Sequence, residues 1–470
     1  MDRPSENPMK IYSTVSSFLT GSAMPVGLIR QAGWTTIGYG TTQVVRLAAV
    51  VILTRLLAPE LFGAMILLTS LRVGIELFTD LGIGQSVVVS RRARDEEFYN
   101  TAWTLQLLRG MALGGLTLLA LPLLHAYYDD ATLQRILPAL SVFLVLTGLH
   151  SISPMIATKE LRTKRIAAYE ITNGLVQSLL VIVAVVISPT IGGLVAGHIL
   201  GAIFAAVASY FILPGLRVRL AFDKSSFWEL ISFGKWIFIS SIIFFLSGYL
   251  DRLLLAKYAT LALLGIYGVA RSLGDAVSQF GMRIANAIVF PKVAAASETG
   301  ALLRLRIDRR RLQFMCLIVV LISLLIAGAH PLVRLLYDQR YIAASSVLPW
   351  IGIATWLAII NSLNDSFALG VSKPHISIVG NLVKLLALVL LLPFGITTAG
   401  ITGAALAAVA AESARYASLS LLLHRERLSF VRQDILTGAV LLALAYSIQL
   451  LGKLIAPDVF SASLFVVVTT

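Results

Sequence analysis

Three ionisable residues, Arg72, Glu76 and Asp80, lie four residues apart inside the apolar stretch Leu61–Val89. On one continuous helix this spacing places all three side chains on the same face. A charge costs at least about 2.5–3.5 kcal/mol at the centre of a bilayer, so such a face turns toward a polar cavity or a partner charge. We therefore predict one helix from Leu61 to Val89 that lines a polar pathway. An internal Arg72–Glu76 ion pair that only locks helix packing is the alternative.

A second basic and acidic pair with the same spacing, Arg271 and Asp275, lies in a later apolar stretch. The two halves of the chain also share residues at a steady offset, as Gly63 and Gly265 do. Repeats that enter the membrane from the same side are related by an axis along the membrane normal, and cargo sites lie between them. We therefore expect Arg72 and Arg271 to approach this interface from opposite halves.

Bases outnumber acids inside the apolar stretches. The candidate substrate-binding residues are Arg46, Arg72, Arg109, Arg271, Arg283, Lys384 and Arg415. The candidate ion-coupling residues are Glu76, Asp80 and Asp275. Because the planar guanidinium fork can hold two phosphate oxygens, an excess of arginine predicts an anionic cargo. The alternatives are structural pairing, as for Arg415 near Glu412, and snorkelling of Arg109 and Arg283 toward the membrane surface.

Composition indicates the elements that must position these charges. Hydrophobic residues make up 57% of the chain and charged residues 13%, which is typical of a multi-pass membrane protein. The formal net charge of +14 is carried mostly by short connections between apolar stretches, so we expect no nucleic-acid partner. One cysteine and six scattered histidines show no metal-binding spacing, so we expect no metal and no other cofactor.

Thirteen apolar stretches are long enough to span a bilayer. They are 34–57, 61–89, 101–124, 136–156, 167–187, 191–213, 236–258, 261–290, 312–333, 347–369, 376–394, 401–423 and 435–455. The tail 459–470 is short for a fourteenth. We predict an all-α integral membrane protein with two pseudo-symmetric six-helix lobes around a central cavity, and one or two extra C-terminal helices.

The predicted organisation follows from these stretches. Residues 1–33 form a cytoplasmic arm, 34–213 the N-terminal lobe, 214–235 a cytoplasmic connection, 236–423 the C-terminal lobe and 435–470 the extra helix or helices. Lysine and arginine gather at 91–94, 159–165, 217–235, 292–311 and 425–432, which all fall on one side of the membrane. The positive-inside rule makes that side, and the N-terminus, cytoplasmic.

The segments LTRLLAPELFGAMILLTSL (Leu53–Leu71) and DLGIGQSVV (Asp80–Val88) resemble the polysaccharide-exporting branch of the multidrug/oligosaccharidyl-lipid/polysaccharide flippase superfamily, and the chain looks like a Wzx-type flippase. The resemblance implies a bacterial inner-membrane protein working by alternating access. Its cargo would be an undecaprenyl-pyrophosphate-linked oligosaccharide, turned from the cytoplasmic to the periplasmic leaflet for lipopolysaccharide or exopolysaccharide biosynthesis. The implied partners are this lipid-linked oligosaccharide, membrane lipid and a coupling ion, H⁺ or Na⁺.

Other functions stay open at this point. A cation-coupled drug or small-molecule antiporter of the same superfamily would use Glu76 or Asp80 as its proton site. A flippase for a lipid-linked peptidoglycan precursor would share the anionic cargo. A polymerase or ligase would need a soluble acceptor-binding loop, but the outward connections are short, and no catalytic spacing is present. We therefore do not expect an enzyme.

Overall fold

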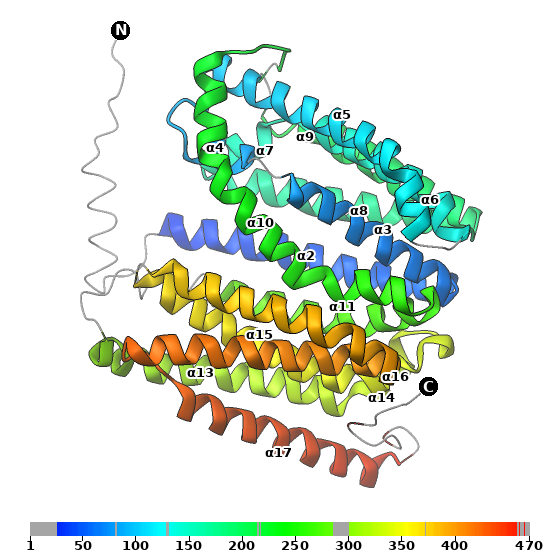
Figure 1. The fold of residues 1–470 in the computed structure, drawn as a ribbon, viewed down its shortest axis with the longest axis vertical. Helices are drawn as coiled ribbons and strands as arrows, with labels where there is room; N and C mark the ends of the chain where they lie inside the picture. The colour runs from blue at the N-terminus through cyan, green and yellow to red at the C-terminus, as the bar shows by residue number, and fades with distance from the viewer. Residues whose placement is uncertain are drawn as a thin grey trace.

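The computed structural model describes residues 26–79, 82–127, 131–213, 216, 218–284, 300–371, 373–457, 460 and 465. Regular structure in these residues is entirely helical (Figure 1), which confirms the predicted all-α class. The N-terminal lobe consists of α2 (Val26–Leu56), α3 (Pro59–Phe78), α4 (Ile83–Val89), α5 (Glu96–Tyr127), α6 (Ala131–Gly148), α7 (Ser153–Lys159), α8 (Thr163–Ile187) and α9 (Ile191–Ser209).

The C-terminal lobe repeats this plan, and one more helix packs outside it. Its helices are α10 (Lys224–Tyr258), α11 (Leu261–Ile284), α13 (Gly300–Ala327), α14 (Ala329–Leu336), the short 3₁₀ helix η2 (Gln339–Tyr341), α15 (Ala344–Gly370) and α16 (Pro374–Arg425). Non-helical Ala399 and Gly400, the latter with a φ of 53°, break α16 into two segments. The extra helix α17 (Val431–Ile455) lies against α13 (Figure 1).

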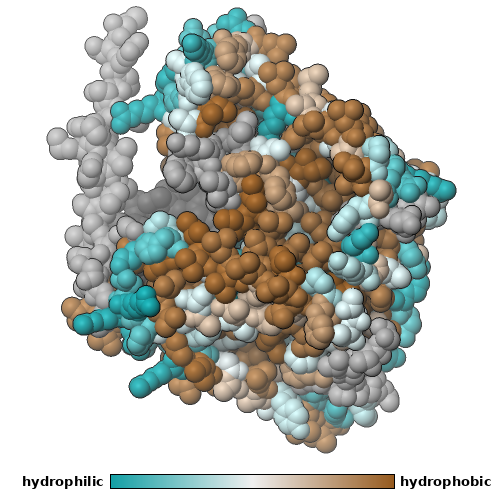
Figure 2. Space-filling view, viewed as in Figure 1, coloured by the Kyte–Doolittle hydropathy of each residue, from teal (hydrophilic) through white to brown (hydrophobic). Residues whose placement is uncertain are grey.

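Many of the helices have the length and hydrophobicity of membrane-spanning segments. Nine helices of the described part are long and apolar enough to cross a bilayer, or ten if the bent pair α6 and α7 counts as one span. Figure 2 shows a broad band of hydrophobic residues across the face in view, with hydrophilic residues toward its left and right edges. Each of the thirteen predicted stretches contains a described helix or a segment of α16. The proposed fourteenth, 459–470, lies outside the described residues apart from Phe460 and Phe465.

The prediction of one helix from Leu61 to Val89 is wrong. The chain leaves the helix after Phe78, and α4 begins only after Gly82, whose φ of 61° is a left-handed conformation that glycine adopts without steric cost. Asp80 lies outside the described residues. The break gives the end of α3 free backbone carbonyls, and the Arg109 side chain of α5 binds one of them, as described below.

Three helices begin eight or more residues before their apolar stretches. Helix α2 begins at Val26 inside the predicted arm, α10 begins at Lys224 inside the predicted connection, and α13 begins at Gly300 within the basic region before residue 312. The start of α10 has a clear cause, because the Asp223 carboxylate accepts a hydrogen bond from the Ser226 amide at 2.8 Å and caps the helix. Polar first turns of this kind extend beyond the apolar part of the helix, so a hydrophobicity pattern does not predict them.

The basic region also contains a buried charge. The Arg311 side chain on α13 is fully buried, pairs with Asp434 of α17 at 2.5 Å and lies over the Phe430 ring at 4.6 Å. An ion pair this deep fixes α17 on the lobe. Arg311 therefore belongs to the packing of the helices and not to an exposed loop.

The two lobes meet along α3 and α11, with α10 running from one lobe to the other (Figure 1). At the crossing of α3 and α11, a Cβ on Gly63 would lie 1.9 Å from the Leu261 carbonyl oxygen. A Cβ on Gly265 would lie 2.2 Å from the carbonyl oxygen of Pro59. Each glycine thus faces the backbone of the other helix, a reciprocal contact of the kind that a two-fold axis produces. This is the geometry that the predicted repeat requires.

The two ends of the bundle differ. We call the end at which α2, α5, α8 and α10 begin the basic end, because Arg92, Arg94, Lys159 and Arg162 lie there, and the opposite end the far end. The α3–α11 crossing is at the far end. There the lobes are also joined by hydrogen bonds from the Tyr341 hydroxyl to the Leu57 carbonyl, at 3.2 Å, and from Arg55 to the Leu335 carbonyl, at 3.1 Å.

Candidate functional site

A cavity of about 440 Å³ lies in the N-terminal lobe between α2, α3 and α8. Its polar lining residues are Thr42, Arg46, Thr69, Arg72, Gln177, Ser178, His198 and Tyr249. We call it the basic cavity. Its charged residues sit in the middle of α2 and α3, where flanking apolar turns hold these helices in the bundle. The cavity therefore places two guanidinium groups beside hydroxyl and amide groups.

The charges of the basic cavity have no counter-ions among the residues that the structure describes. Within the described residues, neither Arg46 nor Arg72 forms an ion pair. The Arg72 guanidinium lies 5.9 Å from the centroid of the Phe143 ring, and the His198 ring packs edge-on at 6.3 Å from the same ring. The buried Nε2 of His198 has no hydrogen-bond partner. Two unpaired guanidinium groups and a free imidazole nitrogen are suited to hold an anion with several oxygens.

A larger cavity of about 750 Å³ lies next to it, toward the basic end, between α3, α4, α5, α6, α7 and α8. Its polar lining residues are Glu76, Gln85, Gln106, Arg109, Thr147, His150, Thr158, Tyr169 and Glu170. We call it the acidic cavity. The Glu76 carboxylate accepts a hydrogen bond from Thr147 at 3.1 Å, and neither Glu76 nor Glu170 forms an ion pair with a described residue. Arg72 and Glu76 therefore do not form the ion pair that was the alternative interpretation.

Arg109 binds the end of α3, where the helix breaks. Its guanidinium donates to the Glu76 carbonyl and to the Thr79 hydroxyl, the latter at 3.0 Å. Gln106, almost one turn earlier on α5, donates to the His150 carbonyl at 2.8 Å, beyond the end of α6. Both side chains thus satisfy backbone groups that the ends of two helices leave without partners. Much of the hydrogen-bonding capacity of Arg109 is therefore used inside the lobe.

The corresponding region of the C-terminal lobe is a network of ion pairs. Arg271 lies 3.0 Å from Asp275 and 3.9 Å from Asp251, and Arg252 lies 2.5 Å from Asp275. The Tyr267 hydroxyl donates to Asp251 at 2.7 Å. These charges come from α10 and α11 and satisfy one another.

A second half of the network joins α15 and both segments of α16. Lys384 lies 2.7 Å from Glu412, which also accepts a hydrogen bond from the Asn361 amide at 2.9 Å. Arg415 pairs with Asp365 at 2.6 Å and lies 3.9 Å from Glu412. The space between the two halves is only about 30 Å³. That volume has room for a water molecule and not for a head group.

The structure thus divides the predicted site residues. Arg46 and Arg72 share the basic cavity, Glu76 and Arg109 line the acidic cavity, and Arg271, Asp275, Lys384 and Arg415 belong to the network. Arg283 lies over the Tyr39 ring, 3.1 Å from its centroid, where α11 meets α2. Asp80 lies outside the described residues. Within the described part, no group of three or more His, Cys, Asp or Glu residues could hold a metal ion.

Sequence reasoning missed the neutral and acidic residues that complete both cavities. Glu170, Gln177 and Ser178 on α8 and His198 on α9 are the main ones. A usable signal was present, because Glu170, Gly174, Gln177 and Ser178 recur at spacings that share one helix face. Polar and small residues on one face of an otherwise apolar helix indicate a lumen.

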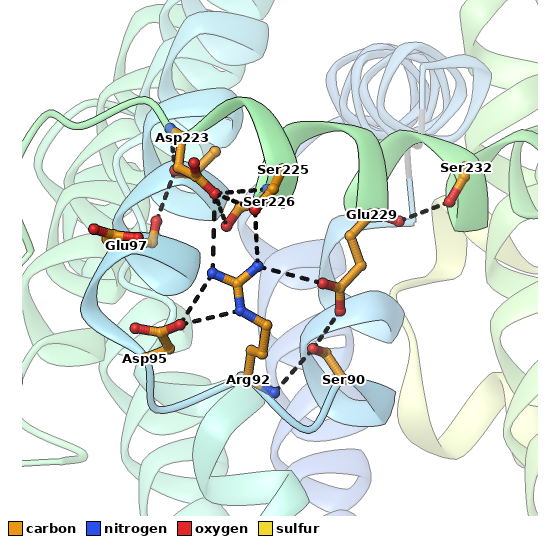
Figure 3. Close-up of polar contacts among 10 residues, drawn as sticks. Ser90, Arg92, Asp95, Glu97, Asp223, Ser225, Ser226, Glu229 and Ser232 are labelled. Atoms are coloured by element: carbon orange, nitrogen blue, oxygen red, sulfur yellow. Dashed lines mark hydrogen bonds and ion pairs between the residues drawn. The ribbon is translucent and has the colours of Figure 1, made fainter.

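A set of polar contacts at the basic end ties α10 to the N-terminal lobe (Figure 3). Arg92, between α4 and α5, lies 3.0 Å from Asp95, 3.7 Å from Glu229 and 3.9 Å from Asp223. Hydrogen bonds from Ser226 and Ser225 hold the pKa of the Asp223 carboxyl well below its usual range. The Asp223 amide also donates to Thr101 of α5 at 2.9 Å. The start of α10 is therefore fixed on one lobe, while its later turns belong to the other.

Comparisons with known proteins extend these observations. The family model described as "Polysaccharide biosynthesis protein" matches residues 52–346. A search of curated protein sequences finds no match. Among solved structures, the lipid II flippase MurJ in an inward closed conformation matches with a TM-score of 0.73 and 13% identity, over 91% of this chain and 96% of that chain.

Two further solved structures are multidrug transporters. An inward-facing multidrug resistance MATE family transporter of the MOP superfamily gives a TM-score of 0.58 at 14% identity, over 87% of this chain and 98% of that chain. A MATE transporter of Vibrio cholerae gives 0.51 at 16% identity, over 85% and 97%. At these identities the likeness concerns the fold. It confirms the predicted two-lobe, all-α architecture of a multi-pass membrane protein.

Proposed function

The chain belongs to the polysaccharide biosynthesis protein family, and from this premise we propose that it is a flippase for an undecaprenyl-pyrophosphate-linked oligosaccharide. The likeness of its fold to solved membrane transporters supports a transporter rather than an enzyme. In this proposal the protein lies in a bacterial inner membrane with its basic end and N-terminus in the cytoplasm. It moves the repeat unit to the periplasmic leaflet, for export of a polysaccharide.

One observation carries the proposal: two arginines face a cavity inside the lobe and have no counter-ion in the described part of the chain. Burying a diphosphate without cationic partners would be prohibitive, and burying arginines without an anion is costly as well. Arg46 and Arg72, with the His198 imidazole beside them, can supply paired donors to phosphate oxygens. We propose that the diphosphate binds here while the prenyl chain stays in the lipid.

The coupled-ion part of the proposal concerns Glu76. Its carboxylate lines a cavity and has no ion pair among the described residues, so it can gain or lose a proton without leaving a partner charge uncompensated. Asp275 lies between Arg271 and Arg252 and is the poorer candidate. Glu76 is therefore the coupling residue that we propose for an H⁺ gradient.

A flippase for a lipid-linked peptidoglycan precursor is the second candidate, favoured by the structural match to the lipid II flippase MurJ. Both cargoes carry a prenyl diphosphate, so the basic cavity suits either. A cation-coupled drug antiporter would have little use for unpaired arginines at this place. The glycan that is transported distinguishes the two flippases.

The test is transport in proteoliposomes that contain the full-length protein. Two fluorescent cargoes are compared, an undecaprenyl-diphosphate oligosaccharide and an undecaprenyl-diphosphate peptidoglycan precursor, and their arrival in the other leaflet is measured. The double variant Arg46→Met/Arg72→Met should reduce transport of the preferred cargo more than about tenfold, since two charge-assisted contacts are lost. Arg135→Met, an exposed base on α6, is the matched control. Wild-type transport by the correctly folded double variant would refute the proposed site.

A further inference from the structure

The two cavities of the N-terminal lobe are neighbours along the same three helices. The residues that line the basic and the acidic cavity, in that order, are Arg72 and Glu76 on α3, Phe143 and Thr147 on α6, and Gly174 and Glu170 on α8. Each pair is one turn apart, and one turn of an α-helix advances about 5.4 Å. A group joined covalently to an anion in the basic cavity can therefore reach into the acidic cavity.

The acidic cavity has the size and lining of a site for a polar, uncharged ligand. Its volume of about 750 Å³ lies in the range of small-molecule sites. Within the described residues, the side chains of Glu170 and Gln85 make no hydrogen bond to another residue, so both are free to bind a ligand. Carboxylates accept hydrogen bonds and an amide both accepts and donates, which matches sugar hydroxyl groups. Apolar neighbours such as Leu113 and Val88 can pack on the carbon faces of a sugar ring.

The charge of the acidic cavity is opposite to that of its neighbour. Glu76 and Glu170 have no ion pair there, whereas Arg109, the basic residue among its lining residues, hydrogen-bonds the end of α3. A sugar with its own carboxylate would be repelled by these two acids, while a neutral or amino sugar would not. The two cavities therefore differ in the sign of the charge that they accept.

We propose that the acidic cavity is a glycan subsite that takes the sugars next to the diphosphate and prefers neutral or amino sugars to acidic ones. This inference rests on the proposed function, because the diphosphate in the basic cavity is what brings the glycan to the acidic one. Glu170 determines the preference, since its carboxylate forms no ion pair and no hydrogen bond within the described residues, although the Arg283 guanidinium acts on it electrostatically. In the membrane the cargo then enters with its glycan toward the basic end.

Equilibrium binding to the purified full-length protein in detergent tests this subsite with three probes. They are undecaprenyl diphosphate, the same lipid carrying one neutral N-acetylhexosamine, and the same lipid carrying one hexuronic acid. The wild-type protein should bind the neutral-sugar probe more tightly than the uronic-acid probe. Glu170→Gln should lower the affinity for the neutral-sugar probe about fivefold, which is the loss expected for one hydrogen bond. It should leave the affinity for undecaprenyl diphosphate unchanged.

Two further variants sharpen the test. Glu170→Lys should reverse the preference toward the uronic-acid probe, and Glu60→Gln, an exposed acid at the far end of α3, should change nothing. An unchanged ratio between sugar-bearing and bare probes in both Glu170 variants would overturn the glycan subsite and leave the diphosphate site standing. If the wild-type protein binds none of the three probes, the proposed function fails, and this inference fails with it.

Discussion

The two lobes share a helix plan but treat their charges in opposite ways. In the C-terminal lobe, Arg252, Arg271, Lys384 and Arg415 pair with Asp251, Asp275, Asp365 and Glu412 around a space of about 30 Å³. In the N-terminal lobe, Arg46 and Arg72 face a cavity of about 440 Å³ without an ion pair among the described residues. We therefore propose a binding site only where charges within the spans lack ion-pair partners among the described residues.

The largest effect on stability should come from the network. Lys384→Met leaves Glu412 without its nearest cation, and breaking a buried pair in this way costs about 3–5 kcal/mol. The double variant Lys384→Met/Glu412→Gln removes both charges and should recover most of the loss. The free energy of unfolding of both variants is measured by circular dichroism in the same detergent.

Arg72→Met is the matched variant in the other lobe. Arg72 has no counter-ion among the described residues that would be left uncompensated, so the substitution should change stability by no more than about 0.5 kcal/mol. Equal losses for Lys384→Met and Arg72→Met would show that the two lobes do not differ in this way.

An effect between those of Lys384→Met and Arg72→Met is expected where the lobes touch. Gly63→Ala would place a methyl group against the Leu261 carbonyl, and overpacking of this kind costs about 1–3 kcal/mol unless the far end opens. Opening can be measured as maleimide labelling of a cysteine at the buried position Tyr341, in a Cys316→Ser background. Labelling should rise in Gly63→Ala. Gly115→Ala, where a Cβ meets nothing within 4 Å, is the control and should leave labelling low.

Glu76→Gln should lower stability by less than Lys384→Met does. The carboxylate accepts one hydrogen bond from Thr147, so the loss should be about 1 kcal/mol. Transport driven by a pH gradient should nevertheless stop, because the amide cannot take up a proton, while exchange of cargo without a gradient continues. Gradient-driven transport at the wild-type rate by this variant would remove Glu76 from the coupling role.

Most of the fold could be predicted from the sequence because apolar length and breaks dominate it. Each predicted stretch contains a described helix, and the family resemblance seen in Leu53–Leu71 is confirmed by the match over residues 52–346. The break after Phe78 was missed, since the apolar stretch continues across it. Its local signals are Gly82 and Gly84, and glycine is often tolerated within a helix.

The site could be predicted less well because pairing depends on distant segments. Arg252 adjoins Asp251 in the sequence, yet its guanidinium pairs with Asp275 of the next helix. Glu412 is nearer to Lys384 than to Arg415, its neighbour on the same helix. Spacing along one helix identifies which charges lie at the same depth, but not which side chain of another helix reaches them.

The reciprocal glycine contact has a consequence for how such a molecule can diverge. In a symmetric dimer of identical halves, every substitution appears twice, so both subunits would carry either a neutral network or an open basic cavity. Joining the halves into one chain releases that restriction, and one half can become a binding chamber while the other becomes a rigid support. At the crossing the restriction persists, because Gly63 and Gly265 each lie against the other's helix and a side chain on either disturbs both.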